Sequence, residues 1–119
     1  MEKVVDVSIK RVYDAPAKAD GIRVLVDRIW PRGIKKEDAK IDMWLKEVAP
    51  STKLRQWFAH DPEKWSDFSG RYLAELKGNT ALAELKALSQ KNKITLLYAA
   101  KDEKHNNAVV LKGLLGRGA

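Results

Sequence analysis

The chain has 119 residues, 45% of them hydrophobic, which fits one folded domain with a modest core rather than a disordered chain. Its formal net charge of +7 favours anionic partners such as phosphorylated metabolites or nucleic acid, although a solvated basic surface would give the same charge. The absence of cysteine excludes disulfides, thiolate catalysis and the common zinc sites, and with 2 histidines we expect no metal site and no cofactor.

Two segments near the N-terminus predict β-strands. The sequence VSIKRVY (7–13) alternates in polarity and predicts a first strand, and DAPAKADG (14–21) predicts a turn-rich connection. IRVLVDRIW (22–30) predicts a second strand, whose centre is apolar on both faces, as in a strand covered by helices. Because the connection is short for a parallel crossover, an antiparallel first strand stays open.

Helices are expected in the middle of the chain. The first is indicated by helically spaced apolar residues from Ile41 to Val48, and the second by a cap at Ser51. The third is expected to start at Asp61 and Pro62 and to end at Gly78. The fourth has a cap at Thr80 and ends near Asn92. The helix that starts at Asp61 carries an apolar stripe of Trp65, Phe68 and Tyr72, which we expect to face the core.

The C-terminal part predicts a third strand at KITLLYAA (93–100), a polar loop at KDEKHNN and a last helix around residues 109–115. The predicted fold class is therefore α/β, a single domain over residues 1–119 with a small, mostly parallel sheet of three or four strands flanked by helices. No apolar run approaches the roughly 18 residues of a membrane span, and the segment after Met1 is unlike a signal peptide. We therefore expect a cytoplasmic protein without membrane contact.

The loop DRIWPRG after the second strand carries half of a candidate site, because ligands of open parallel sheets bind outside the carboxyl ends of the strands. Arg28 and Arg32 offer forked donors suited to phosphate or carboxylate. Trp30 either stacks on a ligand ring or seals the core, and Gly33 lets an anion approach its amide. Asp27 orients an arginine or accepts a proton. An internal Asp–Arg ion pair that only fixes the loop is an equally consistent alternative.

The loop AKDEKHNN after the third strand carries the other half of the site. Lys101, Asp102, His105 and Asn106 precede a helix start, where free amides attract anions. His105 is a candidate acid or base, because an imidazole can both donate and accept a proton. In the alternative, Asn106 or Asn107 is an ordinary N-cap, the role that we favour for Asn106, and His105 is a solvated loop residue.

The short helical segment STKLRQWFAHDP adds Arg55, which flanks the buried face of its helix and can turn toward the site, and His60, for which a structural role is favoured. No glycine-rich phosphate loop and no G-x-S-x-G motif is present. The leading hypothesis is a site for an anionic small molecule, with Asp27 and His105 as candidate acid–base catalysts. One alternative is a nucleic-acid-binding or regulatory module on the basic surface, in which arginines beside Trp30 and Trp57 suit phosphate contact and base stacking. A protein interface is the other alternative.

Several segments together resemble one family: KRVYD, DGIRVLVDRIWPRG, APSTKLRQWF, YLAEL and ITLLYAAKDEKHNNAVVL are similar to the domain of unknown function 488 family, in its short YeaO-like subgroup. The resemblance covers about residues 10–115 and implies an α/β fold with the motif loops gathered on one side; it implies no established activity. Longer members carry cysteines after the last main strand, and this chain has none there, so thiol or metal chemistry does not transfer. The matching motif positions are Arg11, Tyr13, Asp14, Asp27, Arg28, Trp30, Pro31, Arg32, Gly33, Lys101, Asp102 and Asn106.

Overall fold

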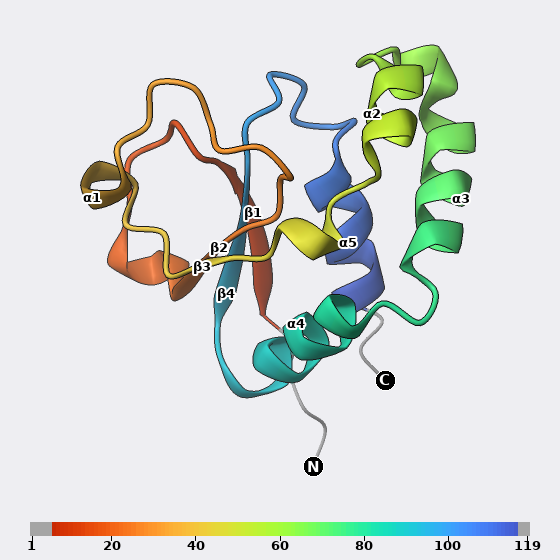
Figure 1. Ribbon diagram of the computed structural model, residues 1–119. Helices are drawn as coiled ribbons and strands as arrows, with labels where there is room; N and C mark the ends of the chain where they lie inside the picture. The colour runs from red at the N-terminus through yellow and green to blue at the C-terminus, as the bar shows by residue number, and fades with distance from the viewer. Residues whose placement is uncertain (1–5, 117–119) are drawn as a thin grey trace.

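A parallel four-stranded sheet forms the centre of the molecule, and most of the helices lie on one side of it (Figure 1). The computed structural model describes residues 6–116. The strands are β1 (Val7–Arg11), β2 (Ile22–Leu25), β3 (Met43–Trp44) and β4 (Ile94–Tyr98), in the spatial order β1-β4-β2-β3. Every pairing is parallel, which confirms the predicted α/β class.

The first strand is parallel, so the antiparallel alternative is wrong. β1 pairs with β4 rather than with β2, and the register joins Val7 to Ile94 and Arg11 to Tyr98. β4 therefore occupies the space between β1 and β2, and the short connection only has to pass over one strand. This connection contains a single 3₁₀ turn at Lys18–Asp20.

The helices are α1 (Lys36–Ala39), α2 (Thr52–Phe58), α3 (Trp65–Leu76), α4 (Thr80–Lys91) and α5 (Asn107–Gly116), with further 3₁₀ turns at Lys46–Val48 and Pro62–Lys64. Side-chain caps mark the starts of α2 and α4. The Ser51 hydroxyl accepts a hydrogen bond from the Leu54 amide at 3.1 Å, which confirms the predicted cap of α2. The cap of α4 is Asn79 and not Thr80, because the Asn79 side chain accepts from the Leu82 amide at 2.9 Å.

The helix predicted between Ile41 and Val48 is wrong. Met43 and Trp44 form β3, which pairs with Val24 and Leu25 of β2, and a 3₁₀ turn follows. Leu45 and Val48 are still buried, because residues three apart lie on the same side of a 3₁₀ turn just as they nearly do in an α-helix. The spacing of the apolar residues therefore predicted correctly which side chains are buried, but not the type of secondary structure.

The predicted strands were also too long. β1 ends at Arg11 instead of residue 13, β2 ends at Leu25 instead of residue 30, and β4 ends at Tyr98 instead of residue 100. After Leu25 the Val26 amide still donates to the Leu97 carbonyl oxygen at 3.1 Å, but the next contact is made by a side chain, since Asp27 Oδ2 accepts from the Ala99 amide. The loops of the candidate site consequently begin closer to the centre of the sheet than the sequence suggested.

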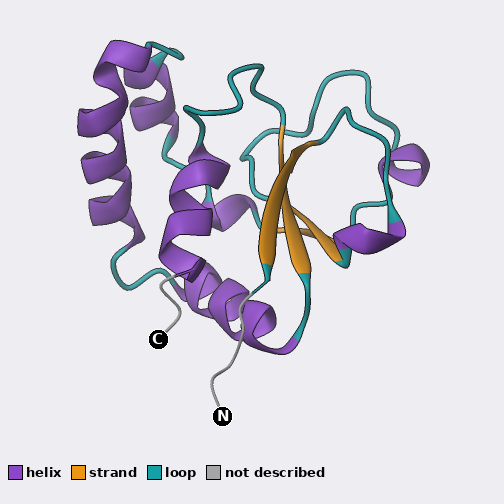
Figure 2. Ribbon diagram, turned by 180° about the vertical axis from the view of Figure 1, so that it is seen from behind, coloured by secondary structure: helices purple, strands orange, loops and turns teal. Residues whose placement is uncertain are grey.

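The two faces of the sheet are covered differently. The face that carries Val24, Leu96 and Tyr98 packs against helices α2 to α5 in one large hydrophobic core. On the opposite face Leu25 and Leu97 are covered by a smaller cluster from the segment between β2 and β3. Figure 2 shows loops and short helical turns, rather than long helices, on that side.

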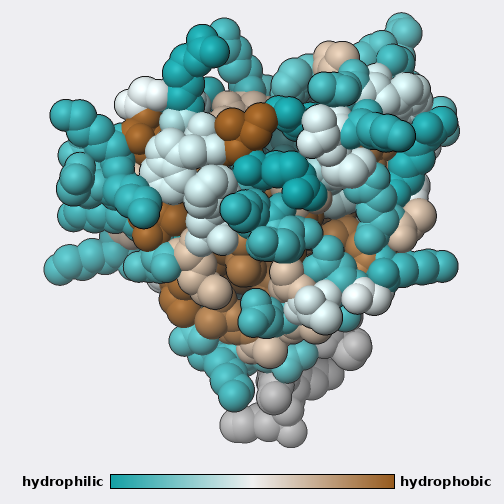
Figure 3. Space-filling view, in the orientation of Figure 1, coloured by the Kyte–Doolittle hydropathy of each residue, from teal (hydrophilic) through white to brown (hydrophobic). Residues whose placement is uncertain are grey.

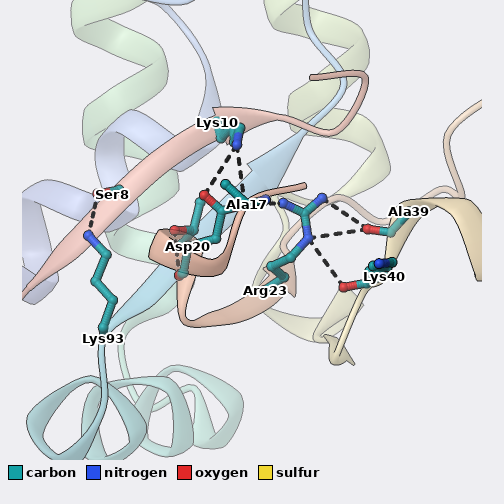
Figure 4. A network of polar contacts seen from close by, with 9 residues as sticks. Ser8, Lys10, Ala17, Asp20, Arg23, Ala39, Lys40 and Lys93 are labelled. Atoms are coloured by element: carbon teal, nitrogen blue, oxygen red, sulfur yellow. Dashed lines mark hydrogen bonds and ion pairs between the residues drawn. The ribbon is translucent and has the colours of Figure 1, made fainter. Parts of the chain in front are cut away.

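A buried ion-pair network holds the loops on the second face (Figure 4). The Asp20 carboxylate accepts hydrogen bonds from Arg23, on β2, and from Lys10, on β1, the latter at 3.2 Å. The Arg23 guanidinium also donates to the Ala39 carbonyl oxygen at 2.9 Å, which attaches α1 to the sheet. Burial opposes ionisation of Asp20, but the Ala17 amide, Lys10 and Arg23 together lower its pKa. The network is therefore structural, and none of Lys10, Asp20 and Arg23 lines the candidate site.

Within residues 6–116, no helix has the length and apolar character needed to cross a membrane.

Candidate functional site

A cavity of about 730 Å³ opens where the loops after β1, β2 and β4 approach α2 and α3. Every predicted site residue except Gly33 lines it: Asp27, Arg28, Trp30, Arg32, Arg55, Lys101, Asp102, His105 and Asn106. Gly33 is exposed and outside the lining, and its φ of +77° identifies it as a turn residue. The loops that follow β2 and β4 are therefore brought together at one edge of the sheet, where hydrophilic residues dominate the upper part of the surface in Figure 3.

Asp27 is the carboxylate at the floor of the site. Its Oδ2 accepts a hydrogen bond from the Ala99 amide at 2.9 Å, and its Oδ1 accepts one from Asn107 Nδ2 at 3.1 Å. Burial raises the pKa of Asp27, although these two hydrogen bonds and the positive charge of Arg55 act in the opposite direction. Asp27 thereby links the loop after β2 to the loop after β4 and to the start of α5.

Arg28 holds a neighbouring loop in place. Its Nε donates to the Pro50 carbonyl oxygen and its Nη2 to the Ala49 carbonyl oxygen, both at 3.2 Å. Arg11 makes the same kind of contact elsewhere, donating to the carbonyl oxygens of Ala100 and Ala99 at 3.0 and 3.3 Å. Both guanidiniums therefore position backbone around the cavity, in addition to the charge that they contribute.

The Asp–Arg ion pair considered from the sequence does not form within residues 6–116: neither Arg28 nor Arg32 lies in ion-pair contact with Asp27. The Arg32 side chain is exposed, and its backbone carbonyl accepts a hydrogen bond from the Tyr13 hydroxyl at 3.0 Å. Lys101 and Arg55 are also exposed and line the same cavity. Cationic side chains from three separate segments thus surround one concave surface.

Asp102 and His105 form a local pair in the loop after β4. His105 Nδ1 lies 2.9 Å from Asp102 Oδ2, and the amides of Lys104 and His105 donate to Asp102 Oδ1 at 2.9 and 3.1 Å. The Lys104 amide, followed by the His105 contact, lowers the pKa of Asp102. The His105 ring also meets Trp65 edge-on, with ring centroids 5.2 Å apart. These contacts fix the orientation of the imidazole at the cavity wall.

Asn106 is the N-cap of α5. Its side-chain oxygen accepts from the Val109 amide at 3.0 Å, and its Nδ2 donates to the Asp102 carbonyl oxygen at 2.9 Å. The capping role that we favoured for Asn106 is thus found, and its side chain is 3% exposed. Asn107, which sequence reasoning treated only as an alternative cap, instead contacts Asp27 and the Val26 carbonyl oxygen. The sequence signal for this role was the pair of consecutive asparagines, because one helix needs only one N-cap and the second asparagine is left for another contact.

His60, for which a structural role was favoured from the sequence, is exposed and lines the cavity. Its φ is +57° and that of the preceding Ala59 is +47°, a left-handed conformation that non-glycine residues seldom adopt. This turn directs the end of α2 toward the site. Tyr13 and the apolar residues Ile29, Phe58 and Phe68 also line the cavity and were not among the expected site residues.

Metal binding has no structural counterpart in the part of the chain that is described: no three His, Asp or Glu side chains of residues 6–116 are placed to hold an ion.

The fold and cavity define a small α/β protein with a basic, partly apolar cavity at the carboxyl ends of a parallel sheet. Comparison with protein families gives a match over residues 6–118 to the family described as "Inactive DUF488-N3 subclade". The chain belongs to the domain of unknown function 488 family, which confirms the resemblance noted in its sequence.

Relatives extend over nearly the whole chain. The uncharacterized protein Rv3073c of Mycobacterium tuberculosis is 44% identical over 115 residues, which cover 97% of this chain and 98% of the relative. The uncharacterized protein YeaO of Escherichia coli is 44% identical over 108 residues, covering 90% and 94%. No solved structure gives a significant match. The names of these relatives carry no activity, so the function has to be argued from the cavity itself.

Proposed function

We propose that this protein binds an anionic small molecule, bearing phosphate or carboxylate, in the cavity between the loops after β2 and β4. The observation that carries the proposal is the convergence of Arg32, Arg55 and Lys101 on one cavity from three separate segments. All three side chains are exposed, so their charges are available to a ligand. Guanidinium and ammonium groups together suit an oxyanion, because they supply both directed donors and positive charge.

The carboxyl group of Asp27 does not remove the preference of the cavity for an anion. Burial raises its pKa, which weakens the preference of this carboxyl for the ionised form. Its two oxygens already accept hydrogen bonds from Ala99 and Asn107, on which the loop geometry depends. Asp27 therefore serves mainly to join the two loops that carry the cationic side chains.

Binding has more support than catalysis. The matching subclade is described as inactive, and the chain contains no cysteine. The acid–base roles suggested for Asp27 and His105 require a proton to move at one of their polar atoms. Both Asp27 oxygens and His105 Nδ1 are engaged in the contacts described above, which leaves His105 Nε2 as the atom for such a role.

The proposal is tested by calorimetric titration of the protein with inorganic phosphate. We expect saturable binding that weakens about tenfold in Lys101→Gln, because one charge-assisted contact is lost. The matched control is Lys53→Gln, since Lys53 is an exposed lysine on α2 outside the cavity lining. Equal loss in both variants would indicate a general charge effect, and no binding of phosphate or of carboxylates such as citrate would refute the proposal.

The alternative of a nucleic-acid-binding module has less support. Its stacking surface was expected at Trp30 and Trp57, but the Trp57 ring is covered by Arg71 at 4.2 Å. The Trp30 ring meets Trp44 edge-on, with centroids 5.4 Å apart. Any nucleic-acid binding should therefore be driven by charge and fall steeply with salt. Titration of single-stranded DNA at two salt concentrations checks this, and sequence-selective binding at high salt would favour the alternative.

A further inference from the structure

The cavity has an apolar part as well as a charged part. Within residues 6–116, large hydrophobic side chains that stay exposed are few, and two of them, Tyr13 at 44% and Ile29 at 56%, line the cavity. Deeper in the lining, Phe58 and Phe68 belong to the hydrophobic core and present their buried rings toward the same space. Exposed apolar area on a concave surface is area that a ligand can remove from water.

The apolar residues are fixed in place. The Tyr13 hydroxyl donates to the Arg32 carbonyl oxygen at 3.0 Å, and the Arg11 guanidinium lies over the Tyr13 ring at 5.1 Å. The Tyr13 ring is therefore attached to the loop that also carries Ile29 and the cationic Arg32. An apolar contact and an anion contact are thus held side by side by one loop.

The volume also exceeds what a simple anion fills. The cavity of about 730 Å³ falls within the range of roughly 300–1,000 Å³ that is typical of sites for drug-sized ligands. An inorganic phosphate occupies a small part of such a space and would leave Tyr13 and Ile29 in contact with water. A ligand with a ring next to its acidic group would cover both parts of the cavity.

We propose that the ligand is an aromatic organic anion, whose acidic group contacts Arg32, Arg55 and Lys101 and whose ring packs against Tyr13 and Ile29. This inference rests on the proposed function, since it assigns a chemical class to the ligand of the same site. The ring is recognised by burial of apolar area, and the acid by charge-assisted hydrogen bonds.

Matched probe pairs test the inference. Phenyl phosphate and methyl phosphate carry the same acidic group and differ in the ring, and benzoate and acetate form the corresponding carboxylate pair. We expect the ring-bearing member of at least one pair to bind about tenfold more tightly, as measured by calorimetry, because burial of the ring adds favourable free energy. The pair with the larger ratio of ring-bearing to ring-free affinity shows whether the acidic group is a phosphate or a carboxylate.

Substitutions then locate the ring. Ile29→Ser and Tyr13→Ser should bring the affinity ratio of phenyl to methyl phosphate close to one. The ratio isolates the ring, because any effect on Arg32 through the lost Tyr13 hydroxyl contact acts on both probes. The control is Leu73→Ser, because Leu73 is 39% exposed on α3 and lies outside the cavity lining. Circular dichroism checks that each variant is folded.

The outcomes separate the two proposals. If the members of both pairs bind equally well, the aromatic class is wrong and the anion site stands. A ratio that survives both Ile29→Ser and Tyr13→Ser also overturns the inference, because the ring would then bind elsewhere. If none of the four probes and no inorganic phosphate binds, the anion site itself is refuted.

Discussion

Replacing Arg28 with lysine should weaken the fold, whereas replacing Arg32 with lysine should weaken ligand binding. Arg28 donates through two nitrogen atoms to the carbonyl oxygens of Ala49 and Pro50. A lysine retains the charge but not the planar fork, so at least one of these charge-assisted hydrogen bonds is lost. The expected cost is about 1.5–3 kcal/mol in the free energy of unfolding.

Arg32→Lys provides the comparison, because its exposed side chain has a different role. Its contact with Tyr13 uses the backbone carbonyl, which the substitution leaves in place. We expect its free energy of unfolding to change by less than about 0.5 kcal/mol, as for surface substitutions in general. Phosphate affinity should fall in this variant, since the forked donor is lost.

Urea unfolding monitored by tryptophan fluorescence, together with phosphate titration, distinguishes the two roles. For Arg28→Lys, the urea concentration at the unfolding midpoint should fall, while the slope of the unfolding free energy against urea concentration stays unchanged. If Arg28→Lys unfolds at the same urea concentration as the parent, the positioning role of Arg28 is wrong. If Arg32→Lys unfolds much earlier and no anion alters either variant, Arg32 serves the fold and not a ligand.

Three further substitutions test individual contacts by urea unfolding. Burial raises the pKa of Asp27 in the folded protein, so its contribution to stability is fully present below the unfolded value of about 3.9 and is lost as pH rises through the folded pKa. Between pH 4 and pH 7, the unfolding free energy of the parent should therefore fall relative to that of Asp27→Asn. A difference between the two proteins that does not depend on pH would contradict the raised pKa. Trp65 is half-buried and stacks on Phe68 with centroids 5.7 Å apart, so Trp65→Ala should cost roughly 2–3 kcal/mol, below the 3–5 typical of fully buried aromatic residues. Tyr72→Phe removes the donor to the Val48 carbonyl oxygen and should cost about 1–2 kcal/mol, and an unchanged midpoint would show that this buried hydrogen bond adds nothing.

Much of the fold was predictable because hydrophobic patterns report burial directly. β2 and β4 were located by apolar residues on both faces, and α2 by its serine cap. Two features were not accessible in this way. β3 consists of Met43 and Trp44 alone, too short for any alternation to show. The insertion of β4 between β1 and β2 depends on pairing between distant segments, which leaves no local signal.

The candidate site was predictable in outline for a different reason. The rule that loops after parallel strands share one edge brought Arg32 and Lys101 to the same cavity without knowledge of the strand order. Contacts to backbone carbonyls were not predictable, because the partners of Arg28 are set by the path of a separate loop. The turn that brings His60 to the cavity was hidden for a similar reason, since a left-handed alanine and histidine have no sequence signature.

The central position of β4 has a consequence for how the chain folds. Both neighbours of β4 precede it in the sequence, and Val7 can pair only once Ile94 is available. During synthesis, β1 and β2 therefore wait with unpaired edges while the segments of α2, α3 and α4 emerge. Sheets that depend on such distant pairings fold slowly, and unpaired strands expose the chain to aggregation in the meantime. Since the cavity lies between the loops that follow β2 and β4, ligand binding should be acquired in the same late step as the sheet.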